Sequence, residues 1–249
     1  MSKQFVAALA LAAAVTACGT STPAQPAQRG AAPAAAAAEQ KGSLDTSPLR
    51  VVESDFPAAE SPEELAAKLP IVAAGVIDGW QQGPILESYP NGPLDYRVVL
   101  RVRITEPLKG VAGRSSLADG LVYIALDQGA VIRDDAVPVD QWKPENSVQD
   151  FSTAMPSGTR ILVFPNEFPK NALGKVRNTG DALPGRARLM SVPPQGIVLE
   201  DPELKARASG DQTALVGGRE PLNVGGAAWL EPKNMNDLVT RLQQHGFTE

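Results

Sequence analysis

The stretch Tyr96-Arg97-Val98-Val99-Leu100-Arg101-Val102-Arg103-Ile104-Thr105 decides the fold class of this 249-residue chain. Valine, leucine and isoleucine occupy its even positions from 98 to 104, and arginines occupy positions 97, 101 and 103. Successive side chains of a β-strand point to opposite faces of the sheet, so we expect one buried face and one solvated face. This pattern is typical of an antiparallel sheet.

The same two-residue period recurs on both sides of this stretch. Runs rich in valine, isoleucine and leucine alternate with clusters of glycine, proline and asparagine, which end strands. The predicted strands span residues 71–80, 96–105, 121–127, 160–164, 187–192 and 196–199. The chain is therefore expected to be mainly β.

Two helices are predicted to flank the strands. Ser61-Pro62-Glu63-Glu64 is a capping box that begins a short helix, and Pro70 ends it. Near the C-terminus, apolar residues follow the spacing of one helix face, and Gly246 and Phe247 predict a Schellman motif. Those apolar residues are Met235, Leu238, Val239 and Leu242.

The N-terminus carries a short apolar run, from Phe5 to Val15, after a positive charge at Lys3. A hydrocarbon core about 30 Å thick needs about 20 helical residues, so this run predicts a signal peptide and not a transmembrane helix. Val15-Thr16-Ala17-Cys18 follows and resembles the lipobox of bacterial lipoproteins. The resemblance implies a signal peptide over residues 1–17 and a diacylglycerol on the thiol of Cys18.

A diacylated Cys18 would anchor the chain to the cell membrane on its extracytoplasmic face, because two acyl chains hold stably where one binds reversibly. The alternative is an ordinary secretory signal with an incidental cysteine. Residues 18–48 are rich in alanine, proline, serine and threonine, and they have few large apolar side chains. They are predicted to be a disordered tether, followed by a single domain over residues 49–249.

Composition excludes several classes of site. The chain has 23 basic and 28 acidic residues, a net charge of −5, one cysteine and one histidine. It therefore lacks the cysteines for a disulfide or an iron–sulfur cluster, and the balance of charge argues against a nucleic-acid partner. No cofactor, metal site or catalytic residue is predicted. The acids of residues 127–140 do not have the spacing of a calcium loop, and His245 lies where a helix dipole favours a cation.

Four segments carry a family resemblance. They are Ile71-Val72-Ala73-Ala74-Gly75-Val76-Ile77, Tyr96-Arg97-Val98-Val99-Leu100-Arg101-Val102, Pro107-Leu108-Lys109-Gly110 and Ser157-Gly158-Thr159-Arg160-Ile161-Leu162-Val163-Phe164. In this order they resemble a widespread group of uncharacterised secreted bacterial domains, which are similar to OB-like barrels. The resemblance covers residues 61–199. It implies an antiparallel OB-like barrel or sandwich with a short N-terminal helix and a C-terminal helix.

In an OB-fold, the ligand face consists of the second and third strands with the loops between strands one and two and between strands four and five. Here those loops correspond to residues 81–95 and 165–186, and residues 128–156 would be an insertion. Five residues are predicted to form an anion-binding face, with the tyrosine as an outward stacking surface: Arg101, Arg103, Tyr123, Lys175 and Arg177. The alternative is a solvated face whose arginine stems cover apolar surface.

These observations favour a non-enzymatic binding or accessory module of the cell envelope. Its partners would be the membrane, through the lipid at Cys18, and an envelope protein or an anionic envelope polymer. One alternative is an extracytoplasmic hydrolase that uses an Asp/Glu pair, because such a pair needs only spatial proximity and leaves no sequence motif. The other is a purely structural envelope component.

Overall fold

A computed structural model describes residues 42–50, 55–168, 174–208 and 212–249 of the chain. The predicted signal peptide, Cys18 and most of the predicted tether lie outside the described residues. Within the described ranges, no helix has both the length and the apolar character needed to cross a membrane.

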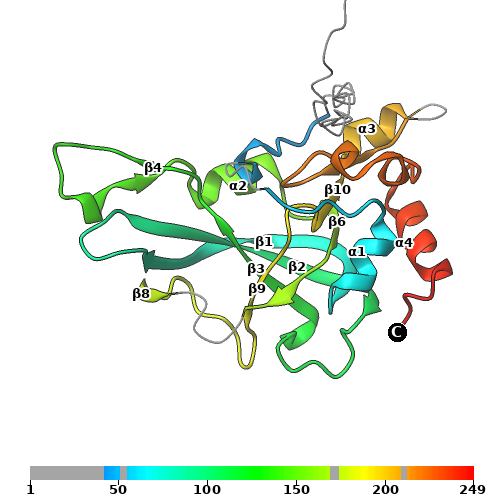
Figure 1. Ribbon diagram of the computed structural model, residues 1–249, viewed down its shortest axis with the longest axis horizontal. Coiled ribbons are helices and arrows are strands. Elements are labelled where there is room, and N and C mark those ends of the chain that lie inside the picture. The colour runs from blue at the N-terminus through cyan, green and yellow to red at the C-terminus, as the bar shows by residue number, and fades with distance from the viewer. Residues whose placement is uncertain (1–41, 51–54, 169–173, 209–211) are drawn as a thin grey trace, which may run out of the picture. The chain divides into compact units, whose positions relative to one another are not determined.

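The described chain is mainly β, as predicted, and most of its strands belong to one curled sheet (Figure 1). Its centre is a long antiparallel hairpin of β1 (Val72–Glu87) and β2 (Leu94–Lys109), with β3 (Leu121–Asp127) on the other edge of β2. The strand order is β11-β10-β6-β1-β2-β3-β9-β7, and β8 pairs with β1 outside this path. The remaining strands are β6 (Arg160–Val163), β7 (Asn166–Glu167), β8 (Lys175–Asn178), β9 (Leu189–Ser191), β10 (Ile197–Glu200) and β11 (Leu215–Gly217).

The sheet is mixed, so the prediction of an antiparallel sheet is wrong at one pair of strands. β9 runs parallel to β3, with Tyr123 beside Leu189 and Ile124 beside Met190. A parallel pair requires a long crossover, and here the chain makes it through residues 128–188. β6 pairs with β1 and β7 pairs with β9, although β6 and β7 follow each other directly along the chain. The sheet thereby curls into a half-barrel.

Two apolar cores pack against the two sides of this sheet. The inner core contains the even positions of β2, namely Val98, Leu100 and Val102, which confirms the predicted buried face. Phe151 of α2 (Val148–Ala154) belongs to the same core, and its ring centroid lies 5.2 Å from that of Trp80. The second core lies under the helices α1 (Pro62–Lys68) and α4 (Met235–Gln244) and contains Leu65, Leu162, Phe164, Trp229, Leu238 and Leu242.

The predicted start of the first helix and the predicted end of the second are confirmed. The hydroxyl of Ser61 accepts the backbone N–H of Glu64 at 3.1 Å, at the start of α1. At the end of α4, the N–H of Phe247 donates to the carbonyl of Leu242 at 3.1 Å, and Gly246 has φ 86°. This is the predicted Schellman motif.

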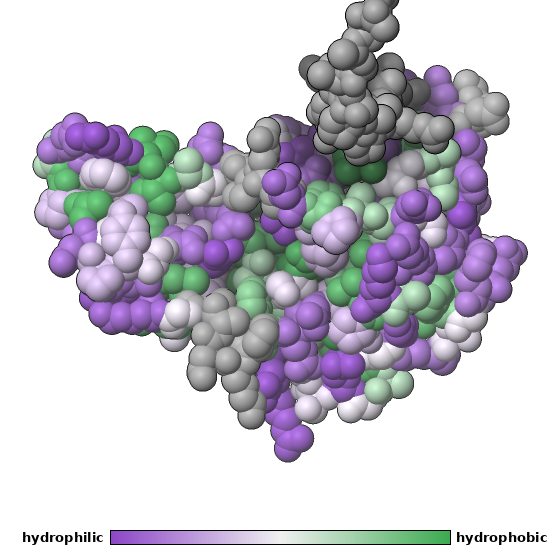
Figure 2. Space-filling view, in the orientation of Figure 1, coloured by the Kyte–Doolittle hydropathy of each residue, from purple (hydrophilic) through white to green (hydrophobic). Residues whose placement is uncertain are grey.

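The other short elements lie mainly in connections. They are η1 (Ser47–Leu49), η2 (Ala118–Gly120), β4 (Val131–Ile132), η3 (Val139–Gln141), β5 (Lys143–Pro144), α3 (Pro202–Arg207), η4 (Leu222–Gly225) and η5 (Ala227–Trp229). β4 and β5 form a separate hairpin within the predicted insertion. Tyr89, at the turn of the long hairpin, and Ile132 of β4 are both exposed, and Figure 2 shows apolar patches among hydrophilic ones at that end.

Candidate binding face

Arg101 and Arg103 lie on the solvated face of β2, as strand alternation predicts, but they share one carboxylate. Nη2 of Arg101 lies 3.0 Å from Oδ2 of Asp78, and Nη2 of Arg103 donates to Oδ1 of the same side chain. The pairing of β1 with β2 sets Gly79 beside Arg101, which brings Asp78 between the two arginines. This group therefore carries a net charge of about +1, and the sequence analysis missed Asp78 because the register of β1 was unknown.

Tyr123 is buried, with 3% of its surface exposed. The prediction of an outward stacking surface is therefore wrong. Tyr123 is paired with Arg101 of β2 on one side and with Leu189 of β9 on the other, so its strand is an inner strand of the sheet at this position. Burial raises the pKa of the Tyr123 hydroxyl, and the neighbouring charge of Arg101 opposes the rise.

Lys175 and Arg177 lie on β8, where they contact Glu87 of β1. Nζ of Lys175 is 3.0 Å and Nε of Arg177 is 2.5 Å from Oε2 of Glu87, whose side chain is only 6% exposed. The contact with Lys175, with further help from the charge of Arg177, holds the pKa of Glu87 below its usual value despite burial. Here too, two cations share one carboxylate.

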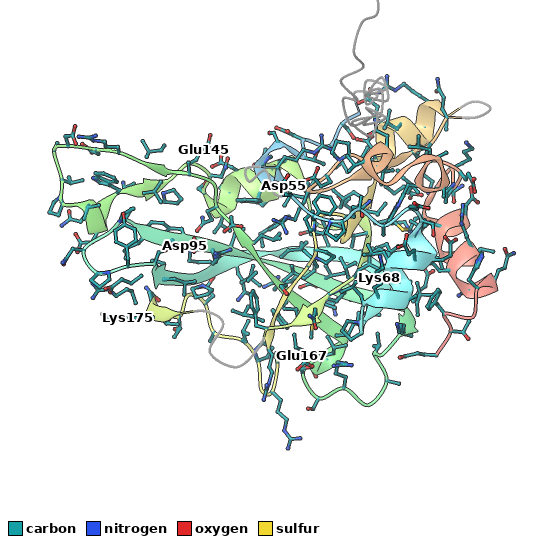
Figure 3. The ribbon with its side chains drawn as sticks, in the orientation of Figure 1. Asp55, Lys68, Asp95, Glu145, Glu167 and Lys175 are labelled. Carbon is teal, nitrogen blue, oxygen red and sulfur yellow. The ribbon has the colours of Figure 1, made fainter. Side chains whose placement is uncertain are left out.

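The structure does not bring the five predicted residues together. Along β1, Gly79 is the partner of Arg101 and Glu87 is the partner of Lys175. Eight residues of a strand span about 26 Å. Figure 3 shows Lys175 at the same end of the long hairpin as Asp95 and away from Glu167. The cationic residues of the predicted anion-binding face therefore form two separate ion-pair groups.

Between these groups, a pocket of about 240 Å³ opens on the outer face of β2. Its lining residues are Gly83, Pro84, Val99, Val176, Thr179, Asp181, Ala182, Leu183 and Leu189. Most of these are apolar, and Thr179 and Asp181 are the polar ones. Both loops that the sequence analysis assigned to a ligand face contribute to the lining, through residues 83–84 and residues 176–183.

The loop over this pocket is fixed to β1 by a reciprocal contact. Oδ2 of Asp181 accepts the N–H of Gln82 at 2.9 Å, and the N–H of Asp181 donates to the carbonyl of Gln82 at 2.9 Å. Gly180 has φ 70°, and a Cβ there would lie 2.3 Å from the carbonyl oxygen of Gly83. Glycine at position 180 therefore permits the close approach that forms one wall of the pocket.

Val99 is the residue whose place in the sequence indicates this pocket. It is an apolar residue between Arg97 and Arg101 on the outward face of β2, and it is 1% exposed. A valine on a face otherwise occupied by arginines can be buried only if another segment packs over it. Residues of the 176–189 segment line the pocket together with Val99. Val176, on the rim, remains 43% exposed.

The pocket can hold an apolar group, with a hydroxyl and a carboxylate at its polar side. Among the described side chains, no group of three or more histidine, cysteine, aspartate or glutamate residues could hold a metal ion. No family model matches the chain, and neither a curated protein nor a solved structure matches it.

Proposed function

We propose that the chain is a lipid-anchored binding module of the cell envelope, and that it holds an apolar group of its ligand in the pocket on β2. The observation that carries this proposal is the mostly apolar lining of that pocket, supplied by β1, β2, β8, the segment between β8 and β9, and Leu189 of β9. Small-molecule sites in proteins are concave and mainly apolar, with a few polar groups that fix orientation. An engineered apolar cavity of about 150 Å³ binds benzene, so the space here suits a group somewhat larger than one aromatic ring.

We infer an OB-like arrangement of the strands, which would place ligand binding on the same face. β1, β2 and β3 are consecutive antiparallel strands, β9 runs parallel to β3, and α2 lies between β3 and β6 along the chain. We infer that β6 with β7 takes the place of the fourth strand and β9 that of the fifth. The pocket then lies beside the second strand, between the loops that bind ligands in OB-folds.

Binding fits this pocket better than hydrolysis. A glycosidase-type mechanism needs two carboxyl groups facing the same bond. Among the described residues that line the pocket, Asp181 alone carries a carboxylate, and it accepts the backbone N–H of Gln82.

The anchoring part of the proposal rests on the sequence around Cys18. Cys18→Ala should leave the chain unprocessed or release it from the membrane fraction. Membrane fractionation and the mass of the N-terminal peptide measure this directly. A wild-type chain that is soluble and carries no lipid mass would contradict anchoring while leaving the pocket proposal intact.

Binding at the pocket can be tested with the hydrophobic dye anilinonaphthalene sulfonate. Ala182→Trp should fill the mouth of the pocket, because Ala182 lines it and is exposed. The matched control is Ala136→Trp, which adds the same ring at an exposed position between β4 and β5. We expect saturable dye fluorescence with the wild type and the control but not with Ala182→Trp. Equal fluorescence with all three chains would refute the pocket as the binding site.

A further inference from the structure

A second candidate site, separate from the apolar pocket, lies at the loop between β2 and β3. This loop binds a carboxylate of the chain itself. The backbone N–H groups of Val111 and Ala112 donate to Oε1 and Oε2 of Glu249, each at 2.6 Å. Two successive N–H groups that converge on one anion form a backbone nest. The contact shows that these two N–H groups are placed to bind the two oxygens of one carboxylate.

Glycines on both sides give the loop its form. Gly110 has φ 65° and Gly113 has φ 68°, a region that side chains disfavour. A Cβ on Gly110 would lie 2.1 Å from the carbonyl oxygen of Pro70. The loop is thus held against the end of α1 with its N–H groups turned toward the C-terminal residues.

Contacts of the residues that follow α4 hold the C-terminal segment beside this loop. The Schellman motif turns the chain after α4, and the ring of Phe247 lies 5.8 Å from Nζ of Lys109. Nζ of Lys109 itself donates to the carbonyls of Ala66 and Ala67. Figure 1 shows the C-terminus beside the turn that follows β2. These contacts fix the direction of the chain after α4, and they place the side chain of Glu249 at the nest.

A polar hollow of about 520 Å³ adjoins the nest. It is lined by Gly110, Ala112, Gly113, Arg114, Ser115, Ser116, Glu167 and Arg188. Glu167 accepts from the hydroxyl of Ser116 at 2.6 Å and from Nη1 of Arg114 at 2.9 Å, and these two bonds hold its pKa below the usual value. Two arginines against one glutamate give the lining a net charge of about +1.

We propose that this nest and its hollow form an oxyanion-binding site, which Glu249 occupies in the free protein and which a carboxylate or phosphate group of a ligand takes over. The N–H groups of Val111 and Ala112 bind the oxygens, and Arg114 and Arg188 supply the positive field beside them. Glu249 then acts as an intramolecular competitor. A group on a short tether has an effective concentration in the millimolar range, which is enough to exclude weak anions.

The test is amide NMR of the full-length chain, titrated with inorganic phosphate and, separately, with acetate. Glu249→Gln removes the charge of the competitor and keeps its shape. The matched control is Glu203→Gln, which removes an exposed carboxylate on α3. A chain that ends at Thr248 serves as a second variant if the glutamine amide still occupies the nest.

We expect the amide resonances of Val111 and Ala112 to shift saturably in Glu249→Gln, with an affinity about fivefold or more above that of the wild type and of Glu203→Gln. Saturation by phosphate alone assigns the site to phosphate groups, and saturation by both anions assigns it to oxyanions in general. The proposal fails if these two amides do not shift in either Glu249 variant. It also fails if the shifts map to Arg101, Arg103 or β8, or if the wild type binds as tightly as the variants.

Discussion

Asp201 accepts the backbone N–H of Leu44 at 2.7 Å, across 157 positions of sequence. The same carboxylate accepts the hydroxyl of Ser43, and it caps α3 through the N–H groups of Glu203 and Leu204. Asp201 is fully buried. Ser43 and Leu44 lie in the range predicted as tether, so one side chain connects two residues of that range to a helix far along the sequence.

Asp201→Ala should lower the free energy of unfolding by about 3 kcal/mol. It removes a helix cap and leaves the N–H of Leu44 without its charged acceptor, and a hydrogen bond to a charged group contributes about 1.5–3 kcal/mol. Urea unfolding measures the loss. Asp140→Ala, at an exposed position, should change stability by less than about 0.5 kcal/mol. Equal losses of unfolding free energy in the two variants would show that the hydrogen bonds of Asp201 make no specific contribution to stability.

The stability of the chain should depend on the ionisation of Asp201. Burial alone would raise the pKa of Asp201, but the N–H groups of Leu44, Leu204 and Glu203 and the hydroxyl of Ser43 hold it below the usual value. A folded pKa below the unfolded value of about 3.9 gives stability that is complete above that pH and is lost as pH falls through the folded pKa.

The measurement is the urea midpoint of the wild type and of Asp201→Asn, from neutral pH to below about pH 3.9. The difference between the two chains should be largest at neutral pH and should shrink in acid. Comparing the chains cancels the slope that comes from other carboxyls with lowered pKa values, such as Glu167 and Glu63. A difference that stays constant with pH would contradict the assignment.

The local elements could be predicted from sequence because their causes are local. The alternation of β2, the capping box at Ser61 and the Schellman motif at Gly246 each depend on residues within a few positions. The structure confirms the alternation and the Schellman motif, and of the capping box it confirms the N-cap hydroxyl of Ser61, while the carboxylate of Glu64 accepts the N–H of Glu60. By contrast, the parallel pairing of β3 with β9 depends on a crossover of some sixty residues, for which no local signal exists.

The candidate site was predicted less well because its contents depend on pairing between distant segments. Alternation did place Arg101 on the solvated face. It could not show that Asp78 would lie beside it, since that follows from the register of β1 and its irregularities near Gly79. Nor could it show that Leu189 would lie beside Tyr123 and help to bury it. The two predicted loops do meet at β2, but their contact creates an apolar pocket and not the expected basic face.

Glu87 should hold β8 against β1. Glu87→Gln removes the charge that Lys175 and Arg177 share, so β8 should open more often. Trypsin cleaves after lysine and arginine, and we expect cleavage at these two residues to become several-fold faster. The matched control, Glu145→Gln, changes a carboxylate in the β4–β5 region and should leave the rate unchanged. Faster cleavage in both variants would point to a general loss of stability.

Asp78 should set how strongly the outer face of β2 attracts anions. Asp78→Asn leaves Arg101 and Arg103 without their shared counter-charge, while the loss of a partly exposed ion pair costs only about 0–1 kcal/mol. The variant should therefore elute from a heparin column at higher salt than the wild type, since the attraction is screened by ions.

The control for this comparison is Asp134→Asn, which changes the net charge equally at an exposed position between β4 and β5. If heparin binds at this face, only Asp78→Asn strongly raises the salt concentration of elution. Adding Arg101→Gln to Asp78→Asn should then lower that concentration again. Equal shifts in the two asparagine variants would mean that heparin senses only net charge. The outer face of β2 would then be a solvated surface with no preference for anions.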